Sequence, residues 1–142
     1  MDIRKLDGAA SAAPQITPAD IAEIKAAGFR GLINNRPDHE DKGQPTNAEI
    51  AAAAADAGLS YAHVPLGREP MTEALVKDMR EALNRVGEPA LMFCRSGTRS
   101  TTLWALAEAG EGRDVDEIIK LAADAGYDLA PMRNTLETLA KR

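Results

Sequence analysis

The residues best suited to chemistry surround the only cysteine of the chain, Cys94. They are small, hydroxyl-bearing or cationic: Arg95, Ser96, Gly97, Thr98, Arg99 and Ser100. A cysteine acts as a nucleophile in its thiolate form, which nearby positive charge favours. An arginine can bind two oxygens of an anion at once. The segment therefore predicts a nucleophilic Cys94 in a site that binds a small anion, with Arg99 as the main anion ligand.

The elements on either side of Cys94 strengthen this hypothesis. Residues 90–93 are apolar and predict a buried strand, and residues 100–109 predict a helix. A strand that turns directly into a helix leaves several backbone N–H groups without partners. Together with the helix dipole these groups bind anions, and Gly97 allows the chain to curl tightly. We expect the amides of residues 95–100, with the Ser96, Thr98 and Ser100 side chains, to contact the anion.

Two further strands are predicted at residues 29–34 and 59–66, and charged residues follow both. Arg36 follows the first strand, and Arg68 and Glu69 follow the second. Ligands of an open parallel sheet bind outside the carboxyl ends of its strands. We therefore expect Arg36 and Arg68 to be secondary anion contacts at the edge that carries Cys94.

Predicted helices alternate with these strands, which is typical of an α/β fold. Residues that favour helix N-termini precede them at Thr17, Thr46, Thr72 and Asp114. We predict one domain over residues 1–142, with a mainly parallel sheet and helices on both faces. Its core should span residues 15–110, and residues 114–142 should form a helical layer that covers the sheet and carries no chemistry.

Composition excludes several classes of protein. The chain has 142 residues and a formal net charge of −5, which argues against a nucleic-acid-binding protein. It has no apolar run long enough to span a membrane. One cysteine permits neither an internal disulfide nor a cysteine-built metal site. We expect a cytoplasmic protein without metal or cofactor.

The sequence also resembles known families. Phe93–Ser100 resembles the Cys-x4-Arg loop of single-domain rhodaneses, in which cysteine carries a persulfide, and less closely the Cys-x5-Arg loop of tyrosine and dual-specificity phosphatases. Residues 28–40 and 61–66, together with this loop, are similar to the phosphatase-like domain of the bacterial β-lactamase hydrolase-like proteins. That resemblance covers about residues 15–109. It implies a fold like that of dual-specificity phosphatases, activity as a sulfurtransferase or a phosphatase, and a persulfide dioxygenase as a partner.

Three functions remain open. The first expectation is sulfur transfer through a persulfide on Cys94, because the loop is one residue shorter than in phosphatases and suits a small anionic sulfane-sulfur donor. The alternative is hydrolysis of phosphoesters by the same Cys94 and Arg99. It needs a general acid, for which Glu69 is the best candidate, ahead of Asp38 and Asp41. The third is a non-catalytic module that binds an anion or a partner; a buried Cys94, or a loop blocked by Arg36, would favour it.

Overall fold

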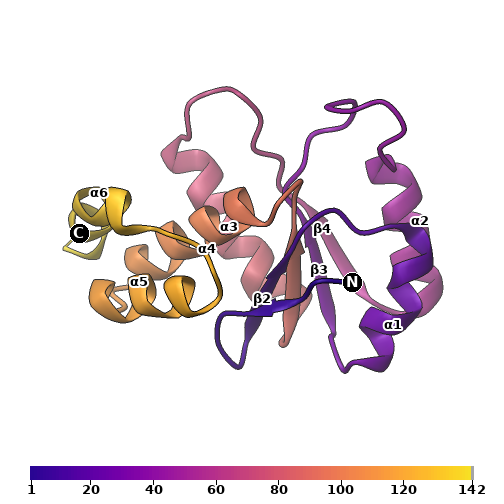
Figure 1. Ribbon diagram of the computed structural model, residues 1–142, viewed down its shortest axis with the longest axis horizontal. Helices are drawn as coiled ribbons and strands as arrows, with labels where there is room; N and C mark the ends of the chain where they lie inside the picture. Colours follow the sequence, from indigo (N-terminus) through magenta and orange to yellow (C-terminus); the bar gives the residue numbers. More distant parts are fainter. Residues whose placement is uncertain (142) are drawn as a thin grey trace.

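The computed structural model describes residues 1–141 and centres on one five-stranded sheet (Figure 1). Its strands are β1 (Arg4–Lys5), β2 (Ala10–Ala13), β3 (Gly31–Asn34), β4 (Ser60–His63) and β5 (Ala90–Phe93). They lie in the order β1-β2-β5-β3-β4, with β1 antiparallel to β2 and all other pairings parallel. The strand that leads into Cys94, β5, is therefore central, and all its residues are buried.

Helices cover both faces of this sheet, as predicted. On one side lie α1 (Ile21–Ala26), preceded by the short turn η1 (Pro18–Asp20), and α2 (Asn47–Ala57); on the other lie α3 (Glu73–Val86) and α4 (Thr98–Gly110) (Figure 1). Two capped starts show why these helices begin where they do. The Thr46 side chain accepts a hydrogen bond from the Glu49 amide, and Thr72 accepts one from Leu75.

The first two strands were not predicted from the sequence. β2 reads Ala-Ser-Ala-Ala, which has none of the β-branched or aromatic residues typical of strands. It becomes a strand because it pairs with β5. The residues packed on both faces of the sheet bury all four of its residues. The sheet, and with it the core, thus begins before residue 15. β2 also reaches the predicted site, since the Ala13 carbonyl accepts a hydrogen bond from the Cys94 amide.

The C-terminal helices do not cover the sheet as expected. α5 (Val115–Asp124), the turn η2 (Ala130–Met132) and α6 (Arg133–Ala140) pack on α4 instead, as an outer layer (Figure 1). Leu136 of α6 is fully buried in the same cluster as Trp104 of α4. The reason lies in α4, whose apolar residues surround the whole helix, so that it needs cover on the side away from the sheet. None of the helices in the described part of the chain has the length and hydropathy needed to cross a membrane.

Candidate active site

Cys94 lies directly after β5, at the start of a tight turn into α4. Its side chain has no exposed surface. The Gly97 amide donates a hydrogen bond to Cys94 Sγ at 3.1 Å, so the turn does direct a backbone N–H group at the sulfur. α4 begins at Thr98, two residues before the predicted start, which places Arg99 and Ser100 in its first turn.

The start of α4 is where the sequence predicts an anion site. Its N-cap residue, Gly97, has a left-handed conformation with φ of 92° and no side chain that could cover the amides of the first turn. Ser96 Oγ and Thr98 Oγ1 hydrogen-bond to each other at 3.0 Å, on an exposed part of the turn. Ser100 Oγ is buried and has no hydrogen-bond partner among the described residues. Of the three hydroxyls predicted to contact an anion, that of Ser100 is therefore the one left without a bond.

Arg99 is held in place from one side. Its Nη1 donates to the Leu66 carbonyl at 2.7 Å, and Nη1 and Nη2 donate to the two carboxylate oxygens of Glu40 at 2.7 and 2.8 Å. The bonds to Leu66 and Glu40 use Nη1 and Nη2 and leave Nε out. The bond to Glu40 raises the pKa of Arg99; burial opposes this, and the charge of an ionised Cys94 and a hydrogen bond to it add to the rise. Arg99 is thus a fixed cation next to Cys94.

Glu40 is the carboxylate that fixes this arginine. Besides Arg99 it accepts a hydrogen bond from Arg36 Nε at 2.9 Å. These contacts, that of Arg99 first, lower the pKa of Glu40 from 4.5 to about 2, although burial acts in the other direction. Glu40 is therefore ionised at neutral pH, and it has no proton to give to a leaving group.

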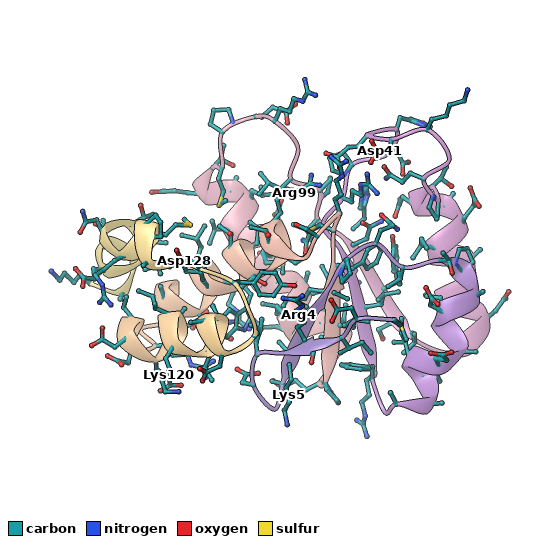
Figure 2. The ribbon with its side chains drawn as sticks, viewed as in Figure 1. Arg4, Lys5, Asp41, Arg99, Lys120 and Asp128 are labelled. Carbon is teal, nitrogen blue, oxygen red and sulfur yellow. The ribbon has the colours of Figure 1, made fainter. Side chains whose placement is uncertain are left out.

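Arg36 was predicted to contact the anion, and the structure shows its guanidinium engaged with three other side chains. Arg36 is only 3% exposed. Its guanidinium donates to Glu40, to Asp41 at 2.6 Å and to Gln15 at 2.9 Å, which leaves it occupied with the loop that follows β3. Arg36 therefore fixes the loop that carries Glu40, and Figure 2 shows Asp41 of that loop at the same end of the sheet as Arg99.

A cavity of about 450 Å³ lies at this end of the sheet, and its lining is mainly charged. The lining residues are Pro37, His39, Glu40, Gly67, Arg68, Glu69, Arg95 and Arg99. The structure thus brings the predicted Arg68, Glu69, Arg95 and Arg99 together, with Arg68, Glu69 and Arg95 exposed at the rim. Cys94 does not line the cavity. A larger, apolar cavity of about 740 Å³ lies elsewhere, among α3, α4 and α6.

The carboxylates proposed as a general acid differ in their surroundings. Asp38 accepts a hydrogen bond from the Asn47 amide at 2.7 Å, at the start of α2. Asp41 pairs with Arg36 at 2.6 Å and with Arg95 at 3.4 Å. Neither lines the cavity. Glu69 does line the cavity. None of the described contacts joins it to Arg36, Arg95 or Arg99.

Two residues of the site were not predicted. The bond from Arg99 to Glu40 joins positions 59 residues apart in the sequence. Tyr127 lies in the segment expected to carry no chemistry, yet its hydroxyl donates to the Ser96 carbonyl at 3.2 Å. No sequence signal marks either contact, because both depend on how distant segments pack.

The chain is similar to known proteins over most of its length. A β-lactamase hydrolase-like protein of Agrobacterium fabrum is 35% identical over 120 residues, which make up 84% of this chain and 28% of that protein. A solved structure of a candidate phosphatase from Neisseria meningitidis covers 98% of this chain and 99% of its own, with 36% identity and a TM-score of 0.84. Tk-PTP in its active form matches with a TM-score of 0.72 at 19% identity, a likeness of fold alone.

The curated relatives are much longer than the matched region, which amounts to 24 to 28% of their length. The model of the phosphatase-like domain of β-lactamase hydrolase-like proteins matches residues 2–111, the part that holds the sheet, the Cys94 turn and α4. The fold is that of tyrosine and dual-specificity phosphatases. The chain belongs to the family of the β-lactamase hydrolase-like protein, phosphatase-like domain.

Proposed function

We propose that the chain hydrolyses phosphate monoesters through a phosphocysteine on Cys94. One arrangement carries this proposal: the Gly97 amide donates a hydrogen bond to Cys94 Sγ, and Glu40 holds the guanidinium of Arg99 beside that sulfur. The guanidinium of Arg99, which Glu40 leaves unoccupied at Nε, and the amides at the start of α4 suit the oxygens of a phosphoryl group. The family and the phosphatase-like neighbours support this activity, and they do not support sulfur transfer.

The reaction has two steps. The Cys94 thiolate attacks phosphorus, a bond forms between sulfur and phosphorus, and the bond to the ester oxygen breaks. Glu69, when protonated, gives its proton to the departing oxygen. In the second step Glu69 takes a proton from a water molecule that attacks phosphorus, and phosphate leaves with Cys94 restored as a thiolate. Arg99 stabilises the charge on the phosphoryl oxygens in both steps.

A different function is favoured by one observation, the complete burial of Cys94. A protein that only binds an anion needs no access to the thiol. In that case the cavity with Arg68, Arg95 and Arg99 would bind the anion, and no covalent intermediate would form.

Turnover of an aryl phosphate, combined with acid quenching and mass spectrometry, separates these functions. We expect the purified chain to hydrolyse the ester, to carry a phosphoryl group on Cys94 after quenching, and to lose about 10³-fold or more in kcat in Cys94→Ser. Binding of phosphate without a trapped intermediate would instead identify a binding module. Faster sulfur transfer from thiosulfate than ester hydrolysis would overturn the proposal in favour of a sulfurtransferase.

A further inference from the structure

One peptide group of the Cys94 turn, that between Ser96 and Gly97, is bonded at both ends. Its N–H group donates to Cys94 Sγ at 3.1 Å, and its carbonyl accepts from the Tyr127 hydroxyl at 3.2 Å. The N–H and C=O groups of a trans peptide point in opposite directions. A hydroxyl that holds the carbonyl away from the sulfur therefore also directs the amide toward it.

The Tyr127 ring occupies the space that a side chain at Gly97 would need. A Cβ built on Gly97 would collide with the Tyr127 hydroxyl oxygen and lie 2.9 Å from Cζ. Glycine allows the backbone many orientations, including ones that would turn the carbonyl toward the sulfur. An inward carbonyl would repel a thiolate or a bound anion. In the structure, contact with Tyr127 accompanies the orientation in which the amide faces inward.

Tyr127 itself is firmly held. It is 6% exposed, its amide donates to the Ala122 carbonyl at 2.8 Å, and the Arg4 guanidinium lies 5.4 Å from the centre of its ring. Burial is the main cause that raises the pKa of Tyr127, Arg4 opposes it, and the charge of an ionised Cys94 adds to it. The hydroxyl therefore keeps its proton near neutral pH and acts as a donor.

We propose that Tyr127 is a positioning residue, which fixes the Ser96–Gly97 peptide so that its amide stabilises the Cys94 thiolate. Tyr127 lies beyond residues 2–111, the region that the family model matches, so a segment outside that region would take part in the chemistry. The inference concerns the thiolate on which the proposed hydrolysis rests. It can be tested without turnover.

The test uses Tyr127→Phe, which keeps the ring over Gly97 and removes the hydroxyl. The matched control is Tyr61→Phe, which removes the other tyrosine hydroxyl; that group bonds to Asn34 and Asn47, neither of which belongs to the Cys94 turn. The fraction of thiolate is followed through its ultraviolet absorbance during a pH titration, with Cys94→Ser as the blank. We expect Tyr127→Phe to need a pH higher by about half a unit or more for the same fraction, and Tyr61→Phe to match the wild type.

Equal titrations of wild type and Tyr127→Phe would overturn the proposal, and so would equal shifts in both tyrosine variants, which would indicate general loosening. A wild type without any thiolate signal would overturn it as well. As a second measurement, the Gly97 amide proton resonance should follow the thiol titration in the wild type and respond less in Tyr127→Phe. The proposed hydrolysis fails separately, if a wild type that forms the thiolate gives no phosphocysteine.

Discussion

Two glutamates share the cavity, and their surroundings suit them to opposite tasks. Glu40 is bonded to Arg99 and Arg36 and stays ionised, with its pKa lowered to about 2. Glu69 stands exposed on the opposite loop of the cavity, without a described contact to these arginines. Enzymes that use two carboxylates commonly separate their roles in this way. Glu40 is a positioning residue for Arg99, and Glu69 is the candidate acid.

The role of Glu69 can be tested through the leaving group. We expect Glu69→Gln to lower kcat/KM, which reports the step in which the alcohol or phenol leaves, about 10²-fold on an alkyl phosphate, whose alkoxide needs a proton. With an aryl phosphate of an acidic phenol the loss should be less than tenfold, because that group leaves unprotonated. Steady-state kinetics on the two esters measure the difference. Equal losses on both esters would show that Glu69 does not act as the acid.

Glu40→Gln removes the charge and weakens the hold on Arg99. We expect the KM for a phosphate monoester to rise about tenfold, since a less ordered arginine binds the anion more weakly.

The same substitution predicts a pH dependence of stability. Because the pKa of Glu40 is lowered on folding from 4.5 to about 2, its charge stabilises the folded state fully above pH 4.5. This contribution disappears as the pH falls through 2. Urea unfolding should therefore show a difference between wild type and Glu40→Gln at pH 7 that shrinks below pH 4.5. A difference that stays constant down to pH 2 would contradict the assignment.

At the scale of elements, the close contact of β3 with α3 sets the distance between the sheet and one helical layer. A Cβ on Gly31 would lie 2.5 Å from Val86 Cγ2 and 2.8 Å from the Val86 carbonyl oxygen. We expect Gly31→Ala to lower the free energy of unfolding by about 1–3 kcal/mol, with little change in kcat. Gly8→Ala is the control, because nothing lies within 4 Å of a Cβ there. Equal stability of the two variants would refute the expected overpacking.

The elements also show what sequence patterns can and cannot predict. β5 and the helix after Cys94 were predictable because an apolar run and a turn-forming segment are local signals. β2 was not, since its alanines become a strand only beside β5. At the site, the placement of Arg99 and Glu69 at one cavity was predictable because both come shortly after strands. The burial of Arg36 was not, since it depends on Gln15, Glu40 and Asp41. Local elements were predictable, and long-range pairing was not.

At the scale of the whole molecule, the distribution of charge matters more for anion binding than the net charge does. The chain carries −5 overall, yet one cavity is lined by three arginines, Arg68, Arg95 and Arg99, against two glutamates, an excess of one positive charge. Such a local field attracts anions and is screened by salt. We expect the KM for a phosphate ester to rise about threefold between roughly 0.01 and 0.15 M ionic strength, and less in Arg68→Ala. Arg85→Ala, which removes an arginine that does not line this cavity, should keep the wild-type salt dependence.

The strand order determines when the sheet can be completed during synthesis. β5 lies between β2 and β3, although both of them leave the ribosome before it does. β3 can pair with β4 as soon as β4 has been made. β2, however, has no parallel neighbour until β5 is inserted between β2 and β3. The nascent chain must therefore carry unpaired strand edges until β5 has been made. Because the Ala13 carbonyl and the Gln15 amide bond to residues 94 and 95, the surroundings of Cys94 become complete only when a segment made before β3 meets one made after α3.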